Sequence, residues 1–288
     1  MALLPFTQIG PTEPLSPLLV DSPHSGRIYP VDFAYACPLN LLRQAEDAYV
    51  DETIAGAAEV GATVLMAEFP RTMIDANRAE NDIDPAILNA VWPRLLEPSP
   101  ATLSGFGLVR RVCRNGIPLY RAPLTIAEVE RRLAVYYRPY HRRLSQLVEE
   151  RLKKFGACYL LDIHSMPHRI ENGGSSPDFV LGDRDGTSCD PDFTRQAQII
   201  LQDFGYHVVL NDPYKGVEIM RRYGLTGQGA QALQIEINRR LYLDESEIKK
   251  NGGFDRLRCH MTEFFQALAK LVSPRGGGNP ATFVSPFF

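Results

Sequence analysis

Residues 157–165 read ACYLLDIHS, and this stretch decides the predicted fold. Its first seven residues form an apolar run interrupted only by Asp162, and the polar pair His164 and Ser165 follows. Such a run is typical of a strand at the centre of a mostly parallel sheet whose two faces are both covered. Four further runs of this kind lie at residues 17–21, 62–69, 207–210 and 232–237.

Helical patterns separate most of these strands. Four helices are expected, over residues 39–60, 125–155, 190–205 and 245–272. The first ends before Gly61, a natural C-terminal cap. The second begins with Thr125 and Glu128 at the spacing of a capping box, and it should kink near Pro139. The last is expected to be interrupted at its two glycines. Strands that alternate with helices predict an α/β fold with three α/β/α layers around a mostly parallel mixed sheet.

The pattern indicates one α/β domain over residues 1–273. Residues 82–123 differ from the rest, because they are rich in proline and glycine, show no clear period and contain Trp92, the only tryptophan. We expect them to form a lid-like excursion over one edge of the sheet. Residues 274–288, PRGGGNPATFVSPFF, are expected to form a C-terminal extension.

Composition narrows the class of protein. The 288 residues carry a formal net charge of −3, and 44% of them are hydrophobic. No basic surface for nucleic acid is indicated, and no apolar run approaches the roughly 18 residues of a membrane span. The N-terminus does not resemble a signal peptide. The five cysteines are scattered and form no C-x-x-C pair, so we expect a reduced, cytoplasmic protein without a disulfide framework.

Polar side chains follow the predicted strands at the edge where ligands gather in α/β sheets. His24 lies just past residues 17–21, and the segment DANR, with Asn77 and Arg78, lies past residues 62–69. His164 follows residues 157–163, and residues 232–237 carry Glu236 near their end. We therefore expect these side chains to converge on one rim of the sheet.

His24 and His164 are candidate metal ligands. A single histidine at a strand end is more often a structural hydrogen bonder, but two such histidines with carboxylates nearby favour a metal site. Asp47 and Asp51 are candidates for a third ligand, because they lie one turn apart in the predicted helix and would share a face. Asp162 lies on the same face of its strand as His164, where it could orient that ring.

Glu236 is a candidate catalytic residue, and several arginines are candidates for substrate binding. Near a metal site, Glu236 could act as a general base, and the competing interpretation is a charge pair with a neighbouring arginine. Arginine binds carboxylates bidentately, so Arg71, Arg78 and Arg221 suggest an acidic substrate. Singly, each arginine fits a surface charge as well.

Several segments together resemble the N-formylglutamate amidohydrolase family. In chain order they include LLVDSPHSGRIYP, EDAYVDE, VLMAEFPRTMIDANR, LLDIHSMP and ALQIEINRRLYLDE. The resemblance spans about residues 18–245. It implies a zinc-carboxypeptidase-like (phosphorylase/hydrolase-like) fold and a zinc-dependent hydrolase of N-formyl-L-glutamate. The products would be formate and L-glutamate, in histidine catabolism.

By position, the resemblance implies that His24, Asp47 and His164 bind zinc. Zinc carboxypeptidases place the acid three residues after the first histidine, where this chain has Arg27, so Asp51 and Glu46 remain rivals of Asp47. Other divalent metals such as Mn²⁺, Co²⁺ or Fe²⁺ also suit two histidines and a carboxylate.

The resemblance also implies that Asn77 and Arg78 hold the α-carboxylate of the substrate and that Glu236 is the catalytic glutamate. We further expect Arg71 to steady the oxyanion, and Arg221 or Lys215 to meet the side-chain carboxylate of the substrate.

Two other functions stay open. One is a metal-dependent deacylase acting on another N-acyl amino acid or a small peptide, and the other is a non-catalytic protein that binds acidic amino acids. In each case the partner is a small acidic molecule. The sequence leaves the number of subunits open, with a homodimer as one option.

Overall fold

The computed structural model describes residues 4–113, 116–168 and 177–273. The chain divides into two compact units, each assembled from several segments. The first unit comprises Met1–Thr7, Pro23–Ala48 and Met66–Arg143, and the second comprises Gln8–Ser22, Tyr49–Leu65 and Leu144–Phe288. The expected single domain over residues 1–273 stays a prediction. The expected extension, residues 274–288, lies outside the described residues.

A seven-stranded sheet forms the centre of the fold, with the strand order β1-β3-β2-β4-β7-β5-β6. Its strands are β1 (Phe6–Ile9), β2 (Leu18–Ser22), β3 (Thr63–Ala67), β4 (Cys158–Met166), β5 (Phe179–Gly182), β6 (Val208–Leu210) and β7 (Ala230–Asn238). The pairs β2–β4, β4–β7 and β5–β6 are parallel, whereas β5 pairs antiparallel with β7. The predicted mixed, mostly parallel sheet is confirmed.

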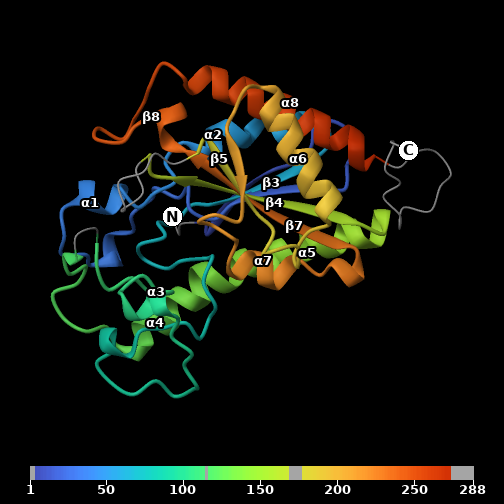
Figure 1. The fold of residues 1–288 in the computed structure, drawn as a ribbon. Helices are drawn as coiled ribbons and strands as arrows, with labels where there is room; N and C mark the ends of the chain where they lie inside the picture. Colours follow the sequence, from blue (N-terminus) through green and yellow to red (C-terminus); the bar gives the residue numbers. More distant parts are fainter. Residues whose placement is uncertain (1–3, 114–115, 169–176, 274–288) are drawn as a thin grey trace. The chain divides into compact units, whose positions relative to one another are not determined.

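Helices cover both faces of the sheet. Figure 1 shows α2 (Val50–Ile54), α6 (Pro191–Asp203) and α8 (Phe254–Val272) on one side, and α5 (Arg138–Phe155) and α7 (Glu218–Tyr223) on the other. The expected three layers are therefore present. The apolar residues of the central strands, such as Leu161 on β4 and Ile235 on β7, are completely buried between them.

The single helix predicted over residues 39–60 is wrong. The chain instead forms α1 (Leu39–Arg43), α2, and the 3₁₀-helix η2 (Ala55–Val60), which ends as expected at a left-handed Gly61. The break lies at Tyr49, whose φ of 62° is incompatible with a right-handed helix. Residues 44–49 therefore turn, and Asp47 is not on a helix.

The helix predicted over residues 125–155 forms with one irregularity. The side chain of Thr125 caps α4 (Ile126–Arg132) by accepting a hydrogen bond from the N–H of Glu128 at 3.1 Å. A π-helical turn over Leu133–Tyr137 joins α4 to α5. This turn directly precedes Pro139, which has no N–H for the regular ladder. The kink predicted near Pro139 stays a prediction, and the observed irregularity is this π-helical turn.

The helix predicted over residues 245–272 begins nine residues later than expected, at Phe254. The chain first forms the hairpin of β8 (Leu243–Asp244) and β9 (Lys249–Lys250), and α8 starts only at Phe254, past the two glycines. In contrast, the helix predicted over residues 190–205 is present as α6, which Asp190 caps.

Residues 82–123 belong to the first unit and are mostly irregular, as their composition predicts. Their described residues include the short helices η3 (Pro85–Ile87) and α3 (Pro100–Leu103). Further 3₁₀-helices in the described ranges are η1 (Val31–Phe33), η6 (Thr226–Gln228) and η7 (Arg239–Leu241). Across the described ranges, no helix has both the length and the apolar character that a bilayer crossing requires.

Candidate active site

His24 lies in the turn that follows β2, and it belongs to the first unit. The turn is held close to the chain after β3, because the N–H of Ile28 donates to the carbonyl of Glu68 at 3.1 Å. Gly26 permits this approach, since a Cβ at that position would lie 2.2 Å from the carbonyl oxygen of Phe69. The His24 side chain is consequently buried, with 1% of its surface exposed.

Two carboxylates flank the His24 ring. Its Nε2 lies 2.6 Å from Oδ1 of Asp75, and its Nδ1 lies 3.5 Å from Oδ2 of Asp47. A ring that donates from Nε2 to a carboxylate carries its lone pair on Nδ1. Burial lowers the pKa of His24, and the nearby charge of Arg71 lowers it further. The geometry therefore favours a neutral imidazole whose Nδ1 faces Asp47, which is the state that a metal ligand requires.

Asp47 is completely buried, and it is positioned by the backbone rather than by a helix. Its N–H donates to the carbonyl of His24 at 3.0 Å, so the two residues are linked directly. The expectation that Asp47 and Asp51 share a helical face is wrong, because the chain breaks at Tyr49 and only Asp51 lies on α2. The other rival, Glu46, accepts hydrogen bonds from Tyr29 at 2.6 Å and from Arg43 at 3.5 Å.

Asp75 is a site residue to which the sequence analysis assigned no role. It accepts hydrogen bonds from Nε and Nη2 of Arg71 at 3.2 and 2.9 Å, and from the N–H of Asn77 at 2.9 Å. Burial on its own would raise the pKa of Asp75, but the charge of Arg71, the hydrogen bond with His24 and the charge of Arg78 outweigh burial and hold this pKa well below its usual range. Asp75 is thus an ionised carboxylate that fixes His24. The sequence could have indicated this role, because Asp75 lies two residues before Asn77 in the segment DANR.

His164 and Glu236 lie side by side in the second unit. They occupy paired positions on the parallel strands β4 and β7, so their side chains share one face of the sheet. Nε2 of His164 lies 2.9 Å from Oδ1 of Asp162, the residue expected to orient this ring. Glu236 is 8% exposed and accepts a hydrogen bond from Nε2 of Gln234 at 3.0 Å.

His24, Asp47 and His164 each offer one ligand atom, and these atoms all lie within 4.8 Å of one another. Two imidazoles and one carboxylate form the three-ligand set typical of catalytic zinc sites. Each ring also contacts an aspartate through Nε2, as metal-bound histidines usually do. The donor atoms and their supporting carboxylates therefore fit a divalent transition metal.

Arginines gather around Asp75 in the first unit. Arg71 forms the two hydrogen bonds described above, and Nη2 of Arg110 lies 4.0 Å from Oδ2 of Asp75. The charge of Arg78 also acts on Asp75. Beside Arg78, the Asn77 side chain is buried. Arg110 was not found from the sequence, because it lies in the irregular residues 82–123, far along the chain from Asp75.

Arg221 and Lys215, expected to meet a substrate carboxylate, belong to the second unit and are mostly exposed. Nε and Nη2 of Arg221 each donate to Glu218 at 2.7 Å, and Nζ of Lys215 donates to Asp185 at 2.9 Å. Both cations therefore already have carboxylate partners at the surface.

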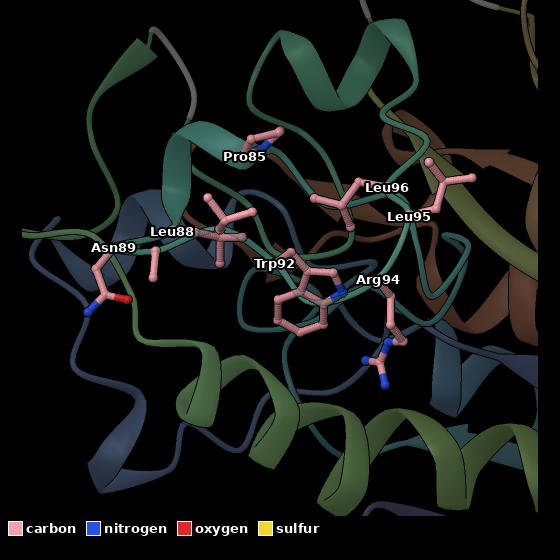
Figure 2. Close-up of a pocket in the computed structure, with 9 residues that line it drawn as sticks. Pro85, Leu88, Asn89, Trp92, Arg94, Leu95 and Leu96 are labelled. Atoms are coloured by element: carbon pink, nitrogen blue, oxygen red, sulfur yellow. The ribbon is translucent and has the colours of Figure 1, made fainter.

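A separate apolar cavity of about 500 Å³ lies within the first unit. It is lined by residues between Pro85 and Leu96, and Figure 2 shows Trp92 at its centre. The guanidinium of Arg94 lies 5.2 Å from the centre of the Trp92 ring. None of the site residues expected from the sequence lines this cavity.

Comparison with known proteins gives consistent results. The family model described as N-formylglutamate amidohydrolase matches residues 16–243. The N-formylglutamate deformylase of Pseudomonas putida is 32% identical over 243 residues, which are 80% of this chain and 83% of the relative. A deformylase of the same name from Pseudomonas aeruginosa is also 32% identical, again covering 80% of this chain and 83% of the relative.

Among solved structures, the N-formylglutamate amidohydrolase from Ralstonia eutropha JMP134 is similar to this chain with a TM-score of 0.90 and 42% sequence identity. The match covers 93% of this chain and 98% of that one. The similarity therefore extends over nearly the entire length of both proteins.

Proposed function

The chain belongs to the N-formylglutamate amidohydrolase family, and on that premise we propose that it hydrolyses the amide bond of N-formyl-L-glutamate to formate and L-glutamate with the help of a divalent metal ion. The observation that carries the proposal is the group of His24, Asp47 and His164, whose ligand atoms lie within 4.8 Å of one another. Two named deformylases among the relatives support the substrate.

In this proposal His24, Asp47 and His164 hold the metal, with Zn²⁺ as the first choice for two imidazoles and a carboxylate. A bound Zn²⁺ would polarise the formyl carbonyl and lower the pKa of the attacking water. Asp75 and Asp162 keep the two rings oriented through their Nε2 atoms.

Glu236 serves as the general base and then as the general acid. It takes a proton from the attacking water and passes it to the nitrogen of the departing amine, so that glutamate leaves as a neutral amine. Its paired position beside His164 on adjacent strands and its low exposure support this role.

Two arginines and an asparagine of the first unit bind and stabilise the substrate. Arg78 and Asn77 bind the α-carboxylate, and Arg71, whose charge acts on His24, steadies the oxyanion that develops on the formyl oxygen. Arg221 and Lys215 are left out, because they are held in surface ion pairs.

The test measures the free amino acid released when purified protein is supplied with N-formyl-L-glutamate, N-acetyl-L-glutamate or N-formyl-L-leucine, since the acetylated substrate would yield acetate instead of formate. We expect kcat/KM for N-formyl-L-glutamate to exceed that for N-formyl-L-leucine at least about 100-fold, because a site built for a charged group rejects an analogue that lacks it. It should exceed that for N-acetyl-L-glutamate about 10-fold or more, because the acyl pocket must then accommodate an additional methyl group. A preference for N-acetyl-L-glutamate or N-formyl-L-leucine would instead support a deacylase of different specificity. Binding without any turnover would support the non-catalytic alternative.

A further inference from the structure

Arg110 is a largely buried cation that has no role in the proposed reaction. Its side chain is 12% exposed, and its nearest carboxylate, Asp75, lies 4.0 Å away and is already engaged by Arg71. Burial lowers the pKa of Arg110 to about 9, and the charges of Arg71 and Arg78 contribute in the same direction. The guanidinium still carries its charge at neutral pH, in a region that contains more arginines than carboxylates able to neutralise them.

The hydrogen-bonding groups of this region are incompletely used. In the ranges that the structure describes, Nε of Arg78 and Nε of Arg110 are buried and have no hydrogen-bond partner. A buried charged group without a hydrogen-bond partner is costly, and it usually indicates a ligand or an ion that completes the site. Two arginines in this state near each other are suited to an anion.

The backbone fixes Arg110 in this position. On one side, the N–H of Asp75 donates to the carbonyl of Leu108 at 2.7 Å, and the N–H of Leu108 donates to the carbonyl of Asp82 at 2.9 Å. On the other side, Arg111 is held by a 2.6 Å hydrogen bond from its Nε to Asp84. Arg110 is therefore presented by a preorganised segment, which lowers the entropy cost of binding a ligand.

The neighbouring Arg111 shows what a structural arginine looks like in this segment. Its Nε bonds to Asp84 and its Nη2 bonds to the carbonyl of Leu103 at 3.2 Å. Among the described residues, the guanidinium of Arg110, the preceding residue, contacts only Asp75 at 4.0 Å and the ring of Phe106, whose centre lies 5.5 Å from its guanidinium carbon. This difference in hydrogen bonding indicates that the guanidinium of Arg110 is available to bind a ligand.

We propose that Arg110 binds the side-chain carboxylate of the substrate and so determines the preference for acidic N-acyl amino acids, an inference that rests on the proposed function. In N-formyl-L-glutamate, Arg78 would then bind the α-carboxylate and Arg110 the side-chain carboxylate. A guanidinium suits this task because its planar fork matches a carboxylate.

The test compares Arg110→Gln with the wild type on N-formyl-L-glutamate and on N-formyl-L-glutamine, whose side chain is neutral. Loss of one charge-assisted contact should raise KM for N-formyl-L-glutamate about 10- to 100-fold, while KM for N-formyl-L-glutamine changes less than about threefold. Arg110→Lys keeps the charge but not the fork, so it should restore part of the lost affinity. The matched control Arg121→Gln, at an exposed position of the same irregular residues, should match the wild type.

A binding measurement keeps the inference separate from the proposed reaction. Calorimetry with glutarate and with butanoate compares a dicarboxylate with a monocarboxylate of similar length, without any turnover. We expect the wild type to prefer glutarate and Arg110→Gln to lose that preference, with an unchanged circular dichroism spectrum. If the ratio of the dissociation constants for butanoate and glutarate is the same in the wild type and in Arg110→Gln, the role of Arg110 is overturned. Absence of formate release by the wild type would instead overturn only the proposed reaction.

Discussion

Nε2 of His24 lies 2.6 Å from Oδ1 of Asp75, a contact between two buried side chains that are 51 residues apart in the chain. Asp75 in turn is held by Arg71 and by the N–H of Asn77. The orientation of one proposed metal ligand therefore depends on a carboxylate that does not bind the metal itself.

Asp75→Asn should weaken metal binding about 10- to 100-fold, because the neutral amide no longer holds the His24 ring in one orientation or raises its basicity. Competition with a chromogenic chelator measures this affinity. The control Asp255→Asn changes an aspartate whose side chain is 82% exposed, and it should leave the affinity unchanged. Equal metal affinity in Asp75→Asn and in the wild type would contradict the role given to this contact.

Gly26→Ala should lower both metal affinity and activity, because its Cβ would lie 2.2 Å from the backbone oxygen of Phe69 and must displace the turn that carries His24. Gly10→Ala is the matched control, since a Cβ there meets no atom within 4 Å. Its unfolding free energy should stay within about 0.5 kcal/mol of the wild type. Metal titration and urea unfolding of both variants make the comparison, and a fully active Gly26→Ala enzyme would show that the turn tolerates the displacement.

Glu236→Gln should lower kcat about 10²- to 10⁴-fold, because the amide cannot accept the proton of the attacking water. Metal content, measured by elemental analysis, should stay at the wild-type level, since Glu236 is not among the three proposed ligands. A variant that loses its metal together with its activity would indicate that Glu236 supports the metal site instead of moving protons.

The α4 helix offers a test of pH dependence. Glu128 accepts hydrogen bonds from Arg131 at 2.8 Å and from the buried Arg132 at 2.7 Å. Burial would raise the pKa of Glu128, but these hydrogen bonds outweigh it and hold the pKa below its usual range. A depressed carboxyl pKa contributes stability that is fully present above the unfolded-state pKa of about 4.3 and is lost as pH falls through the folded-state value.

Glu128→Gln should therefore destabilise the protein by about 2 kcal/mol at pH 7, and the difference from the wild type should shrink steadily below about pH 4. Urea unfolding at a series of pH values measures it. Glu130→Gln removes a partner of the more exposed Arg138 and should cost less than about 1 kcal/mol. A Glu128→Gln effect that is constant from pH 7 to pH 3 would contradict the pKa direction.

Local patterns in the sequence predict the central part of the fold. The apolar runs that became β2, β3, β4 and β7 are recognisable because these strands are largely buried on both faces. The run that became β6 was recognised as well, although that strand is partly exposed. The short β5 was missed, since Phe179–Gly182 offers only four residues and pairs antiparallel with β7. The break at Tyr49 was also missed, because the apolar residues before and after it keep helical spacing. Nothing in that pattern signals the left-handed backbone of Tyr49.

Some residues of the candidate site could be predicted from local sequence patterns, and others could not. His24, His164 and Glu236 could be proposed because each follows or ends a recognisable strand. Asp75 and Arg110 could not, because their importance arises from contacts between segments that are distant in the sequence and that no local pattern encodes.

Metal dependence is the central claim, and its most direct test measures bound metal and formate release on the same samples of wild type, His24→Ala and His164→Ala. The wild type should contain close to one divalent metal per chain, lose formate release in chelator and regain it when Zn²⁺ is added, whereas both variants should lack metal and activity. Full release of formate from N-formyl-L-glutamate by metal-stripped wild type, or by either variant, would contradict the account.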